Sequence, residues 1–148
     1  MYARGGERPP VGTLTRLFFE SLERFDRPDA LQYRVGVNSW RPISHRTLRE
    51  RVRRIALGLR ELGVARGDRV AILSENRPEW ALADWGCLTG GMTDVPIYPT
   101  LPAEQIPYIL VDSGASVIFV SNSTQAEKVA SVRGQVPALR LVIAFDDA

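Results

Sequence analysis

Four side chains lie directly after two apolar segments, where an α/β protein usually places its chemistry. Asn76 and Arg77 lie in the loop after the first segment, and Tyr98 and Thr100 lie in the loop after the second. An amide and a guanidinium can orient a carboxylate or a phosphate through charge-assisted hydrogen bonds, and the second pair can line a channel. Each loop also has a structural interpretation. The first caps a helix and leaves its arginine in solvent, and the second is a turn that starts the next helix.

The two apolar segments belong to one strand–helix–strand unit. Val70–Leu73 is a short apolar run after a Gly-Asp turn, as expected of a buried strand. Pro78 suits the first turn of a helix, Gly90 and Gly91 end that helix, and Thr93–Ile97 is the next apolar run. Two such strands pair in parallel through a right-handed crossover. Ligands of these sheets collect at the carboxyl ends of the strands, which is where the four side chains lie.

The same alternation of helix and strand extends along the chain. Hydrophobic periodicity and the positions of helix-ending residues predict helices over residues 13–25, 44–62, 101–112 and 124–133. The same reasoning predicts a hairpin of strands 30–35 and 40–43, followed later in the chain by strands 116–120 and 139–145. The predicted fold class is therefore α/β: an open, mostly parallel sheet flanked by helices on both faces, with a small N-terminal hairpin. Residues 1–12 are polar and contain Gly and Pro, which predicts a flexible N-terminal arm before the folded unit 13–148.

Local signals fix some helix ends and leave others open. Thr124 and Glu127 have the spacing of a capping box at the start of a short helix. Pro107 fits poorly inside the preceding helix because it removes an N–H donor. That helix therefore either begins near Ala103 or is kinked.

The first predicted helix carries an apolar face whose partner the sequence leaves open. Its apolar side chains recur at steps of three and four: Leu14, Leu17, Phe18, Leu22 and Phe25. Aromatic residues at this spacing usually belong to a core. Phe18 and Phe19 can instead anchor a partner protein.

The charge pattern argues against nucleic acid as a partner. The net charge is +2, and the 19 basic residues, all but one of them arginine, are dispersed without interleaved aromatic platforms. The helix over residues 44–62 is rich in arginine outside its apolar stripe, with Arg46, Arg49, Arg53, Arg54 and Arg60 among them. They either bind phosphate or an acidic membrane, or form a solvated face that pairs in part with Glu50 and Glu61.

Familiar catalytic signatures are missing from the sequence. The chain lacks the Gly-x-Gly-x-x-Gly fingerprint, the P-loop and the nucleophile elbow. The only histidine, His45, has no second ligand for a metal, and the only cysteine, Cys87, is expected to be a buried apolar residue in a reducing compartment. We therefore predict no catalytic and no metal-binding residue. The sequence also has no apolar run long enough for a transmembrane helix.

Three segments resemble the N-terminal part of AMP-dependent acyl-CoA synthetases. They are Gly-Asp-Arg-Val at 67–70, Glu-Asn-Arg-Pro-Glu-Trp at 75–80 and Val-Pro-Ile-Tyr-Pro-Thr at 95–100. The residues of the second and third segments are most similar to those of the long-chain fatty acid branch. The resemblance runs in order from about Thr13 to about Phe145. The resemblance implies that the chain is part of the larger N-terminal domain of an adenylate-forming enzyme. In such an enzyme Tyr98, Pro99 and Thr100 can line an acyl channel, or they form a turn that caps the next helix.

Such enzymes convert a fatty acid and ATP, with Mg²⁺, to an acyl-adenylate and pyrophosphate, and coenzyme A then displaces AMP. Their phosphate loop ends in lysine, and their adenine contacts and mobile C-terminal domain lie further along the chain. The one lysine here, Lys128, lies on a predicted surface helix and matches none of these motifs. The resemblance thus implies a partial subdomain, residues 13–148, cut before the ATP site. We expect it to be inactive alone, with no cofactor bound.

Further expectations concern partners and location. The full enzyme would use fatty acid and coenzyme A, would be cytoplasmic, and would contact the inner face of the membrane peripherally. A cut sheet exposes apolar surface, so the fragment is expected to self-associate. The sequence ends on a predicted strand at 139–145, which suits a truncated domain. The competing hypothesis is a self-contained α/β binding module without catalysis, which shares only the fold.

Overall fold

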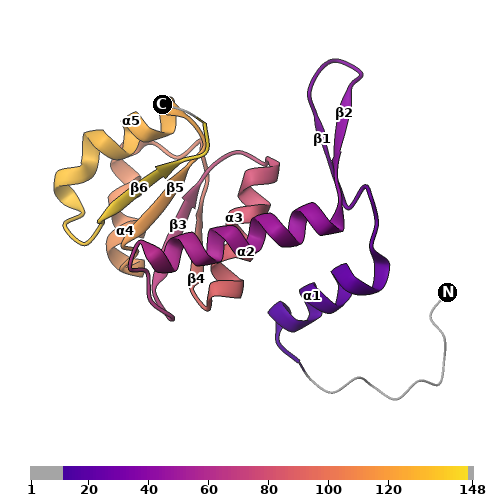
Figure 1. Ribbon diagram of the computed structural model, residues 1–148. Coiled ribbons are helices and arrows are strands. Elements are labelled where there is room, and N and C mark those ends of the chain that lie inside the picture. Colours follow the sequence, from indigo (N-terminus) through magenta and orange to yellow (C-terminus); the bar gives the residue numbers. More distant parts are fainter. Residues whose placement is uncertain (1–11, 147–148) are drawn as a thin grey trace, which may run out of the picture.

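The computed structural model describes residues 12–146, so the arm expected over residues 1–12 lies, except for its last residue, outside the described part. Its elements are α1 (Leu14–Phe25), β1 (Leu31–Arg34), β2 (Trp40–Ile43), α2 (His45–Glu61), β3 (Arg69–Leu73), α3 (Pro78–Gly90), β4 (Thr93–Ile97), the short 3₁₀ turn η1 (Ala103–Gln105), α4 (Ile106–Ser113), β5 (Val117–Val120), α5 (Ser123–Val132), the turn η2 (Arg133–Gln135) and β6 (Leu141–Ala144). The order confirms the predicted alternation (Figure 1).

The main sheet has four parallel strands in the order β4-β3-β5-β6. β3 lies inside the sheet, and its residues Val70 to Leu73 are completely buried. Such a strand is apolar on both faces because helices cover both. β4 is an edge strand in which Pro96 pairs with Ile72 of β3. Proline within a sheet is confined to positions of this kind, because it cannot donate a ladder hydrogen bond.

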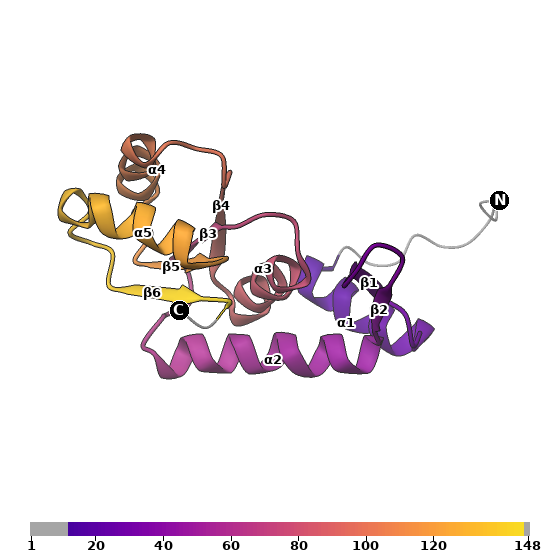
Figure 2. The same cartoon turned by 90° about the horizontal axis from the view of Figure 1, so that it is seen from above.

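Helices cover the two faces of the sheet, as the predicted fold class requires. Ala71 and Leu73 pack with α4 and α5, whereas Val70 and Ile72 pack with α2 and α3. The alternation follows from the two-residue period of a strand. Figure 2 shows the layers, with α4 and α5 on one side of the strands and α3 and α2 on the other.

A third cluster joins α1, α2, α3 and the β1–β2 hairpin, which projects from the body (Figure 1). Phe18 stacks on Trp85 of α3 with ring centroids 4.1 Å apart, so the core interpretation of Phe18 is correct. The predicted apolar face of α1 is only partly right. Leu14, Leu17 and Phe25 remain exposed, because α1 packs through a narrower stripe around Phe18 and Leu22.

Two local predictions need correction. Asn122, and not the Thr124–Glu127 box, caps α5, because its side-chain oxygen accepts a hydrogen bond from the backbone N–H of Gln125. Pro107 is tolerated because the segment is split: η1 precedes it and α4 starts at Ile106. Pro107 therefore lies in the first turn of α4, where a missing N–H costs no helical hydrogen bond.

Close contact between α2 and α3 depends on a glycine. Gly86 of α3 is buried, and a Cβ atom at this position would lie 2.4 Å from Cγ2 and 2.9 Å from Cβ of Ile55. The β-branched Ile55 side chain has little rotamer freedom in a helix. The two helices can approach this closely only because position 86 has no side chain.

Substitution by alanine should have different effects on stability at two helical glycines, Gly86 of α3 and Gly58 of α2. Gly86→Ala is expected to lower the free energy of unfolding by about 1–3 kcal/mol, because the methyl group overpacks against Ile55. Gly58→Ala on α2 meets no atom within 4 Å, and it should be neutral or raise that free energy by up to about 1 kcal/mol. Urea unfolding followed by circular dichroism measures both. Equal stabilities of the two variants would contradict this account of the contact.

Candidate functional site

The loops at the carboxyl ends of the parallel strands form the candidate site. Ser74–Arg77 follows β3, Tyr98–Thr100 follows β4, and Ser121 follows β5. Parallel pairing places these loops at one edge of the sheet, as predicted from the sequence. The described residue Asp146, two positions after β6, joins the same edge through Arg77.

Three of the four predicted site residues line one cavity. Asn76, Tyr98 and Thr100 surround a volume of about 640 Å³ together with Trp80 and Ile97. Tyr98 leaves 81% of its surface exposed, so its ring forms an open wall. The cavity is mainly apolar with a few polar groups, which is the usual character of a site for small molecules.

Arg77, the fourth predicted residue, is engaged within the protein. Its guanidinium donates to both carboxylate oxygens of Asp146 (2.6 and 3.0 Å), to Glu79 (2.7 Å) and to the carbonyl oxygen of Ser121 (3.1 Å). The hydrogen bond with Asp146 raises the pKa of Arg77 most, and the same bond lowers the pKa of Asp146. Arg77 therefore ties three loops together and is not the solvated arginine of the structural interpretation.

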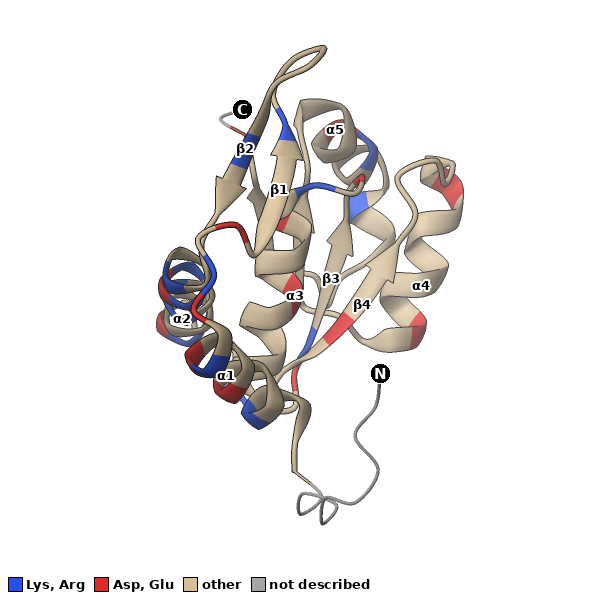
Figure 3. Ribbon diagram, turned by 90° about the vertical axis from the view of Figure 1, so that its right-hand side faces the viewer, with Lys and Arg blue, Asp and Glu red and all other residues tan. Residues whose placement is uncertain are grey.

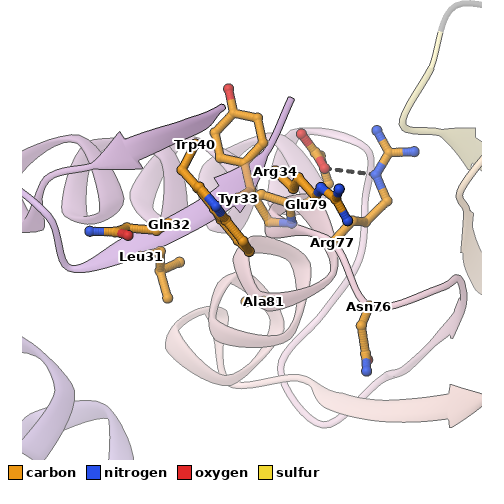
Figure 4. A pocket seen from close by; sticks show the side chains of 10 residues that line it. Leu31, Gln32, Tyr33, Arg34, Trp40, Asn76, Arg77, Glu79 and Ala81 are labelled. Carbon is orange, nitrogen blue, oxygen red and sulfur yellow. Dashed lines mark hydrogen bonds and ion pairs between the residues drawn. The ribbon is translucent and has the colours of Figure 1, made fainter. Parts of the chain in front are cut away.

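Arg77 also lines a second cavity, of about 610 Å³, between the hairpin and the start of α3. Figure 4 shows Trp40 and Tyr33 on the hairpin side and Asn76, Arg77 and Glu79 on the other, with the Arg77–Glu79 contact dashed. Asn76 borders both cavities. The loop after β3 thus separates two hollows.

A polar network behind the first cavity was missed by sequence reasoning. The Gln125 amide donates to Glu75 (3.2 Å) and to the carbonyl oxygen of Pro99 (3.3 Å), and the Lys128 ammonium donates to the carbonyl oxygens of Pro99 (2.6 Å) and Leu101 (3.3 Å). Lys128 is half-buried, and its ammonium is held by these carbonyl oxygens although it lies on the outer-layer helix α5. Because the network joins segments about 25 residues or more apart, no local motif reveals it.

The network contains an ionised carboxylate. The Ser121 hydroxyl beside it, then the backbone N–H of Glu75 itself, and more weakly Gln125, lower the pKa of the Glu75 carboxyl. The Ser121 Oγ nevertheless has no partner at hydrogen-bond geometry among residues 12–146, and neither has the Gln125 Oε1. The cavity wall is therefore negatively charged at Glu75, which disfavours an anion at that point.

The two other side chains that could be reactive, Cys87 and His45, have structural roles. Cys87 is fully buried, and burial, followed by the nearby Asp94 and Asp84, raises the pKa of its thiol to about 12. It is therefore an unreactive thiol at neutral pH. His45 accepts a hydrogen bond at Nδ1 from the backbone N–H of Arg27 (3.1 Å) and so ties the start of α2 to the preceding loop.

Two carboxyl groups face each other between α3 and β4. Burial, and after it the charge and hydrogen bonding of Asp94, raise the pKa of Asp84 to about 6. Within the described range, no cluster of three or more potential ligands could hold a metal ion. Among the same residues, no helix is both long and apolar enough to cross a bilayer.

Comparisons with known proteins agree with this architecture. The model of the family described as "AMP-binding enzyme" matches residues 18–148. The long-chain-fatty-acid–CoA ligase FadD15 of Mycobacterium tuberculosis is 41% identical over 119 residues, which cover 80% of this chain and 20% of FadD15. The human long-chain-fatty-acid–CoA ligase ACSBG1 is 33% identical over 135 residues, covering 91% of this chain and 18% of ACSBG1.

Solved structures show the same relation. The N-terminal domain of FACL13 from Mycobacterium tuberculosis superposes with a TM-score of 0.78 at 26% identity, covering 92% of this chain and 34% of that one. A Mycobacterium tuberculosis fatty acyl CoA synthetase gives a TM-score of 0.76 at 26% identity, covering 88% of this chain and 26% of that one. The chain therefore belongs to the AMP-binding enzyme family, as its motifs indicated. It spans about a fifth of the length of the curated relatives it matches.

The Asp84 carboxyl should make stability depend on pH. Its folded-state pKa of about 6 exceeds the ordinary 3.8, so the folded protein binds the proton more tightly, and stability falls as pH rises between these values. Asp84→Asn is therefore expected to raise the free energy of unfolding by about 1 kcal/mol at neutral pH. The gain should vanish below a pH of about 4.

Denaturant titrations across that pH range measure this effect. Asp112→Asn, at an exposed aspartate in the last turn of α4, is the matched control and should not change the pH slope between pH 4 and 6. A wild-type stability that stays level over this interval, or a control that flattens it equally, would refute the assignment to Asp84.

Proposed function

We propose that the chain is the N-terminal portion of a long-chain fatty acid–CoA ligase. The observation that carries the proposal is its 41% identity to FadD15, a protein named as such a ligase, over 80% of the chain. The overall reaction would join a fatty acid to coenzyme A, with ATP cleaved to AMP and pyrophosphate through an acyl-adenylate. Fatty acid and coenzyme A are the partners that this reaction implies.

The residues present do not fit the nucleotide part of this reaction. A triphosphate with Mg²⁺ needs a cradle of backbone N–H groups, a lysine or arginine and oxygen ligands for the metal. The first cavity contains the Glu75 carboxylate and no basic lining residue, and the guanidinium of Arg77 is already bound to Asp146 and Glu79. We therefore assign no step of adenylation or thioester formation to this chain.

The contribution proposed for this chain is a wall on the substrate side of the longer enzyme. Asn76, Tyr98 and Thr100 line one cavity of about 640 Å³, a volume and apolar character that suit part of an acyl chain. Lys128 and Gln125 support the wall by holding the loop around Pro99. Arg77 would support the wall indirectly, by holding together the loops that it joins.

The chain by itself should not activate fatty acids. Transition-state stabilisation at a transferring phosphoryl group requires preorganised positive charge, and no basic residue of the described chain lines the first cavity. Purified protein of these 148 residues is expected to release no AMP from ATP in the presence of palmitate, coenzyme A and Mg²⁺. Palmitate-dependent AMP formation by this protein would refute the expectation.

A chimera tests the proposed role directly. When this chain replaces the matching segment of FadD15, palmitate- and coenzyme-A-dependent AMP release is expected to persist, because the two segments share the fold and 41% of their residues. Tyr98→Ala in the chimera should lower kcat/KM for palmitate about tenfold or more through loss of the wall. Tyr108→Ala, at a tyrosine on α4 with 75% of its surface exposed, should leave kcat/KM unchanged.

The two results distinguish the alternatives. A chimera that folds but releases no AMP would remove support for the ligase proposal. An active chimera in which both tyrosine variants behave alike would keep the ligase proposal and reject the substrate-side role of Tyr98.

A further inference from the structure

Apart from the two cavities beside the candidate site, a basic hollow lies at the opposite end of the sheet. It has a volume of about 340 Å³ and lies between α1, α2 and the end of α3. Arg66 precedes β3, and Gly90 precedes β4. Because both strands are parallel, these residues mark their amino ends, whereas the candidate site lies at the carboxyl ends. We call this hollow the arginine groove.

The arginine groove combines an apolar floor with a basic rim. Phe19 of α1 and Ala56 and Leu57 of α2 form the floor, and the rim consists of Arg53, Arg60 and Arg66. Leu57 leaves 55% of its surface exposed. Figure 3 shows that charged residues gather on α1 and α2. No acidic residue lines the groove.

The three rim arginines form no ion pair with the described residues, a property that they share with most arginines of this part of the chain. Arg16, Arg27, Arg49 and Arg77 each form an ion pair with an aspartate or glutamate. Among residues 12–146, no carboxylate lies within ion-pair distance of the rim arginines. Three like charges around one hollow repel one another, and a bound anion would relieve that repulsion.

The local structure holds the rim in place. Arg53 and Arg60 lie seven residues, or about two helical turns, apart and so share one side of α2. The stem of Arg66 crosses Gly91, where an added Cβ would lie 3.0 Å from Cγ of Arg66. Gly91 has a φ of +80°, which favours glycine. The turn after α3 therefore leaves room for the Arg66 side chain beside the groove.

We propose that the arginine groove binds a phosphate monoester or diphosphate attached to an apolar group. Guanidinium groups match phosphate oxygens in fixed, bidentate geometry and suit this ligand better than a single carboxylate. The floor of Phe19, Ala56 and Leu57 would cover the apolar group. The same chemistry occurs in free organophosphates and in the headgroup of an anionic lipid. The inference is independent of the ligase proposal, because it concerns the other end of the sheet.

Binding of hexyl phosphate to the 148-residue chain tests the proposal by isothermal titration calorimetry. Inorganic phosphate should bind more weakly than hexyl phosphate, because it lacks the apolar group. Leu57→Ala should remove most of that difference. A triple variant should bind hexyl phosphate at least about tenfold more weakly than wild type; its changes are Arg53→Gln, Arg60→Gln and Arg66→Gln.

A matched control separates the groove from general positive charge. Three exposed arginines of α2 that do not line the groove are changed instead: Arg46→Gln, Arg51→Gln and Arg54→Gln. This control has the same net charge as the groove variant and should bind hexyl phosphate within about twofold of wild type. Equal loss in both triple variants would overturn the proposal. Circular dichroism establishes that each variant is folded.

Vesicles identify the source of the phosphate. Co-sedimentation compares phosphatidylcholine vesicles with vesicles that also contain phosphatidate. Hexyl phosphate binding that the groove variant loses supports a free organophosphate. Binding only to phosphatidate vesicles, again lost in the groove variant and kept in the control, supports a lipid headgroup. Absence of groove-dependent binding to both probes would overturn the proposal.

Discussion

Complete burial of β3 is the constraint on which the rest of the structure depends. Its residues Val70 to Leu73 have no exposed surface, since β4 and β5 flank the strand and helices cover both faces. Burying an aliphatic side chain contributes about 1.5–3 kcal/mol, so this strand secures both layers. Its register with β4 and β5 determines which loops meet at either end of the sheet. The candidate site and the arginine groove are therefore set by the same pairing.

The two ends of the sheet have different electrostatic character. At the carboxyl ends, Arg77 is bound by Asp146 and Glu79, and the Glu75 carboxylate remains ionised beside the cavity. At the amino ends, Arg53 and Arg66 border a hollow without an acidic lining residue. Positive charge is thus neutralised where Asn76 and Tyr98 lie, and it remains available at the other end.

Sequence periodicity predicted the elements of the fold because each has a strong local signal. The strand–helix–strand unit from Val70 to Ile97 could be predicted from its apolar runs, Pro78 and a pair of glycines alone. Side-chain contacts between distant segments have no such signal. The bonds from Arg77 to Asp146 and from Lys128 to Pro99 join residues 69 and 29 positions apart. The sequence therefore predicted which loops meet at the carboxyl ends of the strands, but it missed which of their side chains are already engaged.

The same distinction explains the smaller errors. Thr124 and Glu127 matched a capping pattern, but Asn122 occupies the cap because α5 begins two residues earlier than that pattern requires. The exposed Leu14 and Leu17 followed the helical period of α1, yet only one side of that helix meets α2 and α3. A period predicts which residues share a face, and tertiary packing decides how wide a stripe is covered.

Because of Pro96, the two edge strands β4 and β6 differ in how well they can pair with a further strand. The backbone N–H of Thr93 points toward β3, where it donates to Asp68. Backbone directions alternate along a strand, so position 96 faces outward, and its proline offers no donor there. An incoming strand would meet an interrupted ladder beside β4, whereas Leu141–Ala144 of β6 contains no proline. Enlargement of the sheet, by more of the same polypeptide or by another molecule, is therefore directed to the side of β6.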